Sequence, residues 1–194
     1  MELHAFCDAS KDAYGVVVYL QSKSSKSSQP KIIAAKARLA PNTKLSVPRL
    51  ELLAAVIACR FLAHVEKSLQ RKNIKKYLWG DSRCVIAWTI GKRLLPGFIE
   101  KAVKEIREAS LEKFLYVPSD KNPADIVSRG GDLAALKSQN WWHGPEWLAN
   151  RESWPDQKAT YDRQTELLAK QVAAGLQNRN PNGTKNRNGI RSGT

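Results

Sequence analysis

A chain of 194 residues is long enough for one domain of ordinary size plus an additional segment, and it can bury a real hydrophobic core. Its formal net charge of +14 favours a polyanionic partner such as nucleic acid over a basic surface kept only for solubility. No signal-peptide pattern opens the sequence and no apolar run approaches about eighteen residues. We therefore expect a soluble, intracellular chain without a membrane partner, or a domain cut from a longer chain.

The first forty residues predict three strands of an antiparallel meander. The runs LHAFCDAS, YGVVVYL and KIIAAKARLA are β-branched or alternate between apolar and polar residues. A short Lys-Asp-Ala connection separates the first two runs, and the Ser/Lys-rich QSKSSKSSQP separates the second and third. This spacing indicates two hairpins, the second with a long tip.

From Ser46 the apolar period changes to that of a helix. Ser46 is a plausible N-cap, Pro48 suits the first turn, and the pattern continues to about Leu69. The apolar face consists of Leu50, Leu53, Ala54, Ile57, Ala58, Phe61 and Val65. We expect this segment to be the main buried helix.

The next segments alternate between strand and helix patterns. YLWGD predicts a fourth strand ending on Asp81, and Ser82–Ile90 and Pro96–Ala109 predict helices. KFLYVP predicts a fifth strand that stops at Pro118. In KNPADIVSRG, Asn122 can cap a very short helix. The order predicts an α/β fold, a five-stranded mixed sheet flanked by helices.

Composition divides the chain into three parts. We predict a folded domain over residues 1–130, a Trp-rich extension over 131–155 that packs on or beside it, and a basic, largely disordered tail over 156–194. The run WWHGPEWLANRESWP holds four tryptophans in fourteen residues, which favours packing over a small core rather than stacking on nucleotide bases. The tail contains one amphipathic stretch, TELLAKQVAAGL.

Cysteine and histidine offer little chemistry in this sequence. The odd number of cysteines in apolar runs argues against a disulfide framework, and no CxxC or Cys/His spacing indicates zinc. We interpret the histidines as structural residues, two of them at the surface or half-buried and one among the tryptophans: His4, His64 and His143.

Four acids stand at the ends of predicted elements. Asp8 ends the first strand, Glu51 lies in the opening turn of the main helix, Asp81 ends the fourth strand, and Asp125 lies on the short late helix. An α/β fold gathers functional side chains at strand ends and helix starts, so several of these acids can meet at one edge of the sheet. Clustered carboxylates repel one another unless cations neutralise them, and Mg²⁺ prefers oxygen ligands. A basic chain with such a site suggests a nuclease, although acids also occur at element ends by chance and Glu51 can simply favour the helix dipole.

The ordered motifs FCDAS, PRLELLAA, LWGDS and NPADIVSRG resemble the ribonuclease H domain of retroelement polyproteins. PRLELLAA and WWHGPEWL resemble more narrowly the BEL/Pao group of long-terminal-repeat retrotransposons. The resemblance covers Leu3 to Trp154, about four fifths of the chain. It implies an RNase H-like fold and endonucleolytic hydrolysis of the RNA strand of RNA·DNA hybrids during reverse transcription.

The resemblance also implies a cofactor, a ligand set and partners. Two Mg²⁺ ions, or Mn²⁺, would be held by Asp8, Glu51, Asp81 and Asp125. The partners would be an RNA·DNA hybrid and a reverse transcriptase domain in the parent polyprotein, with no small-molecule cofactor. The location would be the cytoplasm, a virus-like particle or the nucleus. Family members often carry a histidine shortly before the last acid; here Tyr116 occupies that place, and a phenol cannot shuttle protons near neutral pH as imidazole can, so a slower enzyme is expected.

Four residues next to these acids are candidates for substrate binding. Ser10, Ser82 and Asn122 can donate hydrogen bonds to phosphates or to ribose 2′-hydroxyls. Turn and cap chemistry explains the same three residues equally well. Arg49 can meet a phosphate or lie on a solvated helix face. The basic runs at 71–76 and 92–93 can contact nucleic-acid backbone without reading its sequence, or simply be solvated.

Two other classes of protein share the expected sheet. One is a catalytically idle RNase H-like module that binds nucleic acid or tethers its neighbours; the four acids argue against it and the absent histidine argues weakly for it. The other is an integrase or transposase core, which places its last acid on a long late helix. Here Glu51 comes early and Asp125 lies in a short segment, so an active hybrid-specific endoribonuclease is the favoured hypothesis.

Overall fold

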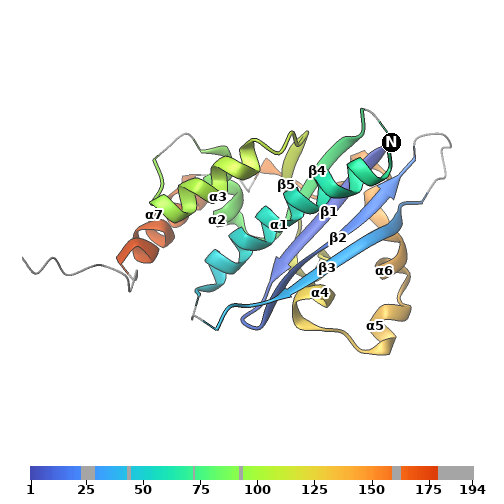
Figure 1. Cartoon of the computed structure of the whole chain (residues 1–194), viewed down its shortest axis with the longest axis horizontal. Coiled ribbons are helices and arrows are strands. Elements are labelled where there is room, and N and C mark those ends of the chain that lie inside the picture. The colour runs from blue at the N-terminus through green and yellow to red at the C-terminus, as the bar shows by residue number, and fades with distance from the viewer. Residues whose placement is uncertain (23–28, 43–44, 72, 92–93, 159–162, 179–194) are drawn as a thin grey trace, which may run out of the picture.

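The computed structural model describes residues 1–22, 29–42, 45–71, 73–91, 94–158 and 163–178. Five strands form one mixed sheet in the order β3-β2-β1-β4-β5 (Figure 1). The bounds are β1 Glu2–Ala9, β2 Ala13–Gln21, β3 Lys31–Leu39, β4 Lys75–Gly80 and β5 Lys113–Tyr116. β1 to β3 form an antiparallel meander, whereas β4 pairs in parallel with both β1 and β5. The predicted five-stranded mixed sheet is confirmed.

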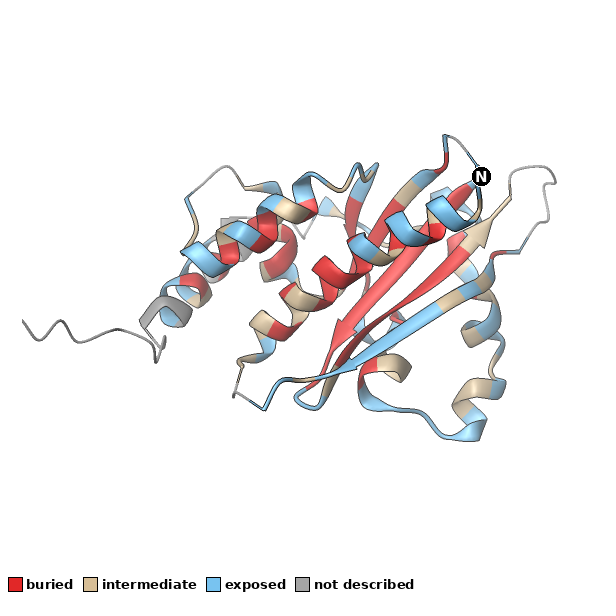
Figure 2. Cartoon of the chain, viewed as in Figure 1, coloured by how far each residue is buried: buried red, intermediate tan, exposed pale blue. Residues whose placement is uncertain are grey.

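The two faces of the sheet follow the alternation of side chains along the strands. In β1, Leu3, Ala5 and Cys7 join a large core on one face, and Phe6 joins a smaller core on the other face. Figure 2 shows β1 and β2 buried along most of their length, whereas β3, at the sheet edge, is largely exposed. The fold therefore has three layers, and each core needs its own cover.

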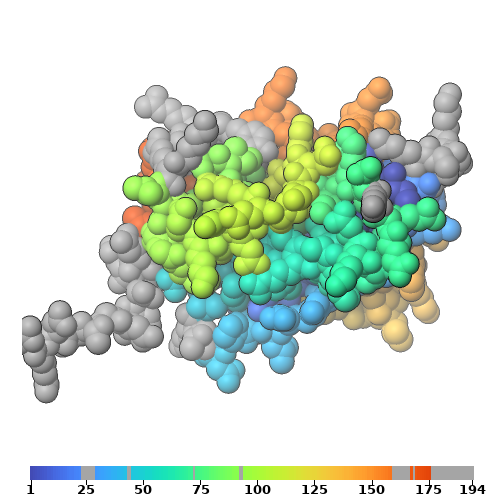
Figure 3. All heavy atoms as spheres, turned by 45° about the horizontal axis from the view of Figure 1, so that its top comes forward, coloured from blue at the N-terminus to red at the C-terminus, as the bar shows by residue number. Residues whose placement is uncertain are grey.

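Helices α1 (Val47–Ser68), α2 (Arg83–Ile90) and α3 (Gly97–Arg107) cover the larger core. As predicted, α1 begins after Ser46 with a proline in its first turn, and Leu69 ends it. The surfaces of α1 and α3 lie side by side in Figure 3. Between these helices, Arg60 donates two hydrogen bonds to Glu105 at 2.5 and 2.8 Å. Packing against α2 and α3 holds α1, and therefore Glu51, against the sheet.

One predicted feature of the C-terminal part is wrong. A largely disordered tail was expected from residue 156, but Arg163–Asn178 form helix α7, which packs against α2. Ala169 and Ala173 are buried in the large core, and the indole Nε1–H of Trp88 donates to the carbonyl of Ala169 at 2.9 Å. Small residues four apart let the helix approach closely, so its apolar stripe outweighs the polar composition around it. Residues 179–194 of the expected tail lie outside the described residues.

The smaller core is covered by the Trp-rich extension. The extension contains α5 (Leu133–Lys137), α6 (Gln139–His143) and the 3-10 helices η2 (Glu146–Ala149) and η3 (Arg151–Ser153). α5 and α6 lie across the sheet from α1 in Figure 1. Trp141, Trp147 and Trp154 pack on the cluster that contains Phe6 and Trp79, in agreement with the packing interpretation, whereas Trp142 is half exposed.

His4 is not a surface residue, contrary to the expectation. It is fully buried in β1, stacks on Tyr77 at 5.1 Å and accepts a hydrogen bond from the Trp79 indole at 3.2 Å. Burial lowers the pKa of His4 below its ordinary value. The burial of His4 could not be predicted locally, because the alternation of the strand places His4 on the sheet face that the distant Trp-rich extension covers. Among the helices that the structure describes, none has both the length and the apolar character that a membrane span requires.

Candidate active site

The two parallel strands in the middle of the sheet end beside each other. Cys7 of β1 pairs with Gly80 of β4, so the next residues, Asp8 and Asp81, leave the same edge of the sheet on neighbouring strands. Parallel strands present their carboxyl ends on one side, which is where α/β folds collect functional side chains. Asp8 is 5% exposed, while Asp81 is partly exposed.

Helix α1 brings a third carboxylate to this edge. Glu51, in the second turn of the helix, lines a narrow cavity together with Asp8 and Asp81. Its carboxylate accepts a hydrogen bond from the hydroxyl of Ser82 at 2.6 Å, which links α1 to the residue that caps α2. The expected meeting of these three acids therefore occurs, with residues from the sheet and from one helical layer.

The fourth acid comes from the opposite layer. Asp125 begins the five-residue helix α4 (Asp125–Arg129), which packs on the smaller core. Asn122 attaches this segment to the sheet: its amide donates to the carbonyl of Cys7 at 3.0 Å, and its side-chain oxygen accepts from the amide of Ala124 at 3.1 Å. This short helix has one buried residue, Ser128, and it holds Asp125 next to the end of β1.

Each of the four carboxylates has a side-chain partner. Ser128 donates to Asp8, and Ser119 donates to Asp81 at 2.7 Å. Glu51 accepts from Ser82, as described, and the guanidinium of Arg129 lies 2.5 Å from Asp125. The site thus brings four acids to one edge of the sheet, three held by serine hydroxyls and one by an arginine.

Burial and mutual repulsion disturb the ionisation of two of these acids. Burial raises the pKa of Asp8 to about 6, an increase that the hydrogen bond from Ser128 opposes and the charges of Asp81 and Asp125 reinforce. Burial likewise raises the pKa of Glu51 to about 6, with further increases from Asp81 and Asp8. The four carboxylates are therefore close enough to interact, and a cation between them would relieve the repulsion.

The donor set fits a hard divalent cation. All four groups are carboxylates, which Mg²⁺ and Mn²⁺ prefer. Besides burial, the charges of neighbouring acids contribute to the raised pKa values of Asp8 and Glu51, and a cation would neutralise this repulsion. Within the described residues, no three His, Cys, Asp or Glu side chains lie close enough together to share an ion as they stand. Their carboxylates are instead turned toward Ser128, Ser82, Ser119 and Arg129.

Comparison with known families agrees with this arrangement. Residues 1–82 match the family model of the Pao retrotransposon-like RNaseH-like domain. This N-terminal segment is therefore similar to an RNase H-like domain of the Pao type. The resemblance to a BEL/Pao-type ribonuclease H domain is thereby confirmed, and the matched segment includes Asp8, Glu51 and Asp81. A search of curated proteins found no match.

Solved structures show the same fold. RNase H1 from the halophilic archaeon Halobacterium salinarum superposes with a TM-score of 0.50 at 19% identity, over 66% of this chain and 96% of that chain. The N-terminal RNase H domain of a Mycobacterium tuberculosis protein, solved as a fusion with maltose binding protein, gives 0.51 at 14% identity, over 70% of this chain and 96% of that chain. The predicted RNase H-like fold is confirmed.

The residues predicted to bind substrate mostly support the RNase H-like fold itself. The Ser10 hydroxyl donates to the carbonyl of Ser128 at 2.7 Å and accepts from two amides of its own turn. Asn122 is 5% exposed, and its side chain attaches the α4 segment to the sheet. Ser82 caps α2. Arg49 lies over the ring of Phe98 at 5.6 Å. The structure thus favours turn and cap chemistry for the two serines and the asparagine.

Tyr116, expected in place of the family histidine, lies at the end of β5. The guanidinium of Arg83 stacks over its ring at 4.9 Å, and its backbone amide and carbonyl both bond the side chain of Gln157. Among the described residues, the structure therefore gives Tyr116 a partner in Arg83 rather than in one of the four acids.

The basic run at 92–93, which was predicted to contact nucleic-acid backbone or to be solvated, lies outside the described residues.

Three residues of the site were not predicted from the sequence. Ser128 and Arg129 follow Asp125 by three and four residues, which places them on its face of α4, and that spacing was a usable signal. Ser119 lies six residues before Asp125 in η1 (Ser119–Lys121), and nothing in its sequence context connects it with Asp81. Each of the three contacts a candidate metal ligand.

Proposed function

We propose that the chain is a metal-dependent ribonuclease H that hydrolyses the RNA strand of RNA·DNA hybrids during retroelement reverse transcription. The observation that carries the proposal is that Asp8, Glu51, Asp81 and Asp125 come from different parts of the chain to one edge of an RNase H-like sheet. The net charge of +14 supports a polyanionic substrate. The parent polyprotein would supply the reverse transcriptase domain.

Asp8, Glu51, Asp81 and Asp125 would hold two Mg²⁺ or Mn²⁺ ions. When bound, such ions activate water and stabilise the leaving oxygen in phosphodiester hydrolysis. The chain itself orients the carboxylates. Ser128 fixes Asp8 from the α4 side, Ser82 fixes Glu51 from the start of α2, and Ser119 holds Asp81. To hold an ion together, the carboxylates would turn from these hydroxyl groups and from Arg129 toward one another.

Arg83 and Arg129 are the cationic side chains nearest to this chemistry in the contacts that the structure gives. Arg83 extends from the start of α2 over Tyr116, and Arg129 extends from α4 to Asp125. Both are exposed, so each can reach the backbone phosphates of a bound hybrid. Phosphate contacts position a substrate without reading its sequence, which suits a nuclease that acts on many hybrids.

The test is cleavage of an end-labelled RNA·DNA hybrid beside the matching RNA and DNA duplexes, with Mg²⁺, Mn²⁺ or EDTA. The parent should cut only the RNA strand of the hybrid and only with metal, and Asp81→Asn should abolish cutting while keeping the fold. Glu112→Gln is the matched control, because Glu112 precedes β5 at the opposite end of the sheet and pairs with Lys75. Binding of the hybrid without cleavage by the parent would instead indicate an idle nucleic-acid-binding module.

A further inference from the structure

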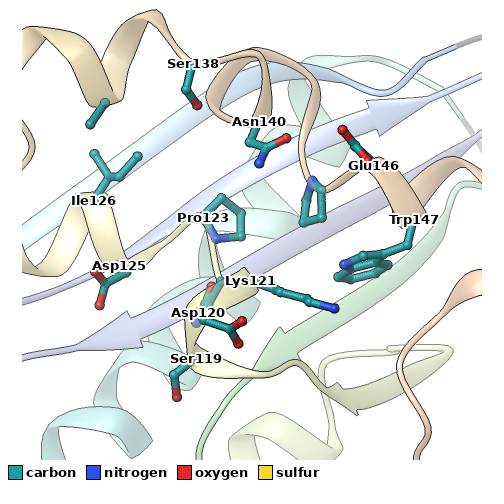
Figure 4. Close-up of a pocket in the computed structure, with 13 residues that line it drawn as sticks. Ser119, Asp120, Lys121, Pro123, Asp125, Ile126, Ser138, Asn140, Glu146 and Trp147 are labelled. Carbon is teal, nitrogen blue, oxygen red and sulfur yellow. The ribbon is translucent and has the colours of Figure 1, made fainter.

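A second pocket lies next to the four acids, on the other side of α4. It has a volume of about 580 Å³ and separates the segment from η1 to α4 from the Trp-rich extension (Figure 4). Asp125 lines its edge, so the pocket adjoins the candidate active site, but none of the other three acids lines it. Its size falls in the range of small-ligand sites.

One wall of this pocket is flat and apolar. Trp147 provides it, and Pro123, Pro145 and Ile126 add further apolar lining to the pocket. The Trp147 ring is held from behind by Trp79, at 4.9 Å between centroids, and by Phe6 at 6.1 Å. Its indole Nε1–H is buried and has no hydrogen-bond partner among the described residues. A rigid aromatic wall of this kind suits a planar ring, since stacking of bases on tryptophan is a common mode of single-strand recognition.

Hydrogen-bond donors and hydrogen-bond acceptors both line this pocket. In Figure 4 the amide of Asn140 and the carboxylate of Glu146 lie on one side of the pocket, across from Lys121, whose side chain extends toward Trp147. The pocket therefore offers a carboxylate that accepts hydrogen bonds, an ammonium that donates them, and an amide that does both. Asn140, Glu146 and Lys121 are exposed and free to meet a ligand.

The charges of the pocket decide which part of a nucleotide it can take. Asp120 and Glu146 outweigh Lys121, and the charge of Asp125 is already compensated by Arg129. In a chain of net charge +14, such an acidic pocket would repel a phosphate group and accept a neutral heterocycle. Guanine matches best, because its edge offers N–H donors to a carboxylate and an oxygen acceptor to an ammonium.

We propose that this pocket binds the base of an unpaired nucleotide, preferentially guanine, with the phosphates outside. Such a base exposes its pairing edge only when it is single-stranded, so the pocket would hold an unpaired nucleotide beside the hybrid that is cut. The inference rests on the proposed function in that the pocket shares Asp125 with the active site. A hybrid with an unpaired guanosine next to the duplex should bind several-fold more tightly than a blunt hybrid.

The experiment uses the full chain with ¹⁵N-labelled tryptophan, in EDTA and without hybrid. Guanosine, adenosine, cytidine and uridine 5′-monophosphates are titrated to about 10 mM, a range suited to millimolar affinity. We expect the guanosine nucleotide to shift the Trp147 indole signal, assigned with Trp147→Phe, and to bind more tightly than the other three. Glu146→Gln should weaken this binding about tenfold by removing a charged acceptor, and the control Glu112→Gln should not. Both positions are exposed, so both variants are expected to fold.

Two outcomes would overturn the inference. In one, none of the nucleotides shifts the Trp147 signal, or Glu146→Gln binds as the parent does. In the other, arginine amide shifts this signal and the nucleotides do not, which would assign the pocket to a cationic ligand. Because metal and hybrid are absent, a failure here is independent of the result of the Asp81→Asn cleavage test.

Discussion

Gly15 of β2 and Val127 of α4 touch so closely that a side chain at position 15 would force the neighbouring atoms to move. A Cβ atom on Gly15 would lie 2.3 Å from Cγ1 of Val127 and 2.8 Å from the carbonyl oxygen of Lys36. Helix α4 therefore rests directly on the backbone of β2. Since α4 has only five residues, this contact and the attachment through Asn122 determine where Asp125 lies.

Gly15→Ala should displace α4 and reduce cleavage more strongly than it reduces stability. We expect a loss of about 1–3 kcal/mol in the free energy of unfolding, because the new methyl group overpacks a tight contact. Hybrid cleavage should fall by about 10- to 100-fold, because misplacing a catalytic group by about 1 Å has effects of that size. Urea unfolding and single-turnover cleavage measure the two effects.

Gly97→Ala is the control for this change, since a Cβ at Gly97 meets nothing within 4 Å. The double variant Gly15→Ala/Val127→Ala should recover part of the lost activity by removing the nearer obstacle. Parental activity in Gly15→Ala would mean that α4 does not set the position of Asp125.

The raised pKa values of Asp8 and Glu51 predict that the metal-free protein loses stability as the pH rises. Both carboxyls have a pKa of about 6 in the folded chain, above the ordinary values of 3.8 and 4.5, so the folded state binds more protons than the unfolded state between these values. The contribution of these two carboxyls to the free energy of unfolding therefore decreases from about pH 4 to about pH 6 and then levels off.

Asp8→Asn should remove part of this penalty. At pH 7 and in EDTA we expect the variant to be more stable than the parent by about 1–2 kcal/mol, and at pH 4 the difference should vanish. An asparagine oxygen can still accept the hydrogen bond that Ser128 donates to Asp8. Thermal unfolding at both pH values measures the difference. A variant less stable than the parent at pH 7 would contradict the raised pKa of Asp8.

The sequence predicted the sheet and its main helices because their signals are local. Alternation in β1 and β2, and the apolar period from Leu50 to Val65, are set by residues within one element. α7 was missed as a folded element because its short apolar stripe is stable only against Trp88 of α2, a contact between distant parts of the chain. Tertiary packing of this kind leaves only a weak trace in a single sequence.

The same distinction applies to the site. The four acids could be selected as candidates because each stands at the end of an element whose bounds the sequence predicts. Their hydroxyl partners could not be paired with them: Ser119 and Asp81 are 38 residues apart, and Ser128 and Asp8 are 120 apart. Such pairs depend on strand order and on the position of η1 and α4, which local patterns do not determine.

Arg151 should be important for the stability of the Trp-rich extension. Its guanidinium donates to Glu2 at 2.5 Å and to the Tyr77 hydroxyl at 2.6 Å, and it stacks over the Trp154 ring at 5.2 Å. The Glu2 side chain is only 3% exposed, whereas that of Arg151 is half exposed. Loss of a partner of a buried charge is costly, so Arg151→Ala should lower the free energy of unfolding by about 2–3 kcal/mol.

Arg151→Lys should recover only part of this loss, because an ammonium cannot reproduce both the forked hydrogen bonds and the stacking. Lys104→Ala is a control for an exposed ion pair, with Glu108 at 3.9 Å, and should cost less than about 0.5 kcal/mol. Denaturant unfolding measures all three variants. Equal losses for Arg151→Ala and Lys104→Ala would show that the contact with Glu2 does not anchor the extension.

Arg129 is expected to compete with divalent cations for the four acids. Its guanidinium lies 2.5 Å from Asp125, and the hydrogen bond to Asp125 raises its pKa, with further increases from the charges of Asp125, Asp8 and Asp81. Arg129→Gln removes this positive charge, so Mg²⁺ should bind the hybrid-free protein about 3- to 10-fold more tightly, as expected for one partly screened charge. Calorimetric titration with Mg²⁺ and Mn²⁺ at low salt measures the change, and the difference should shrink as salt is added.

Lys104→Gln, which removes an equal charge from an exposed position on α3, should leave the affinity unchanged. Weaker metal binding by Arg129→Gln would instead mean that Arg129 holds Asp125 in the orientation that the ion requires.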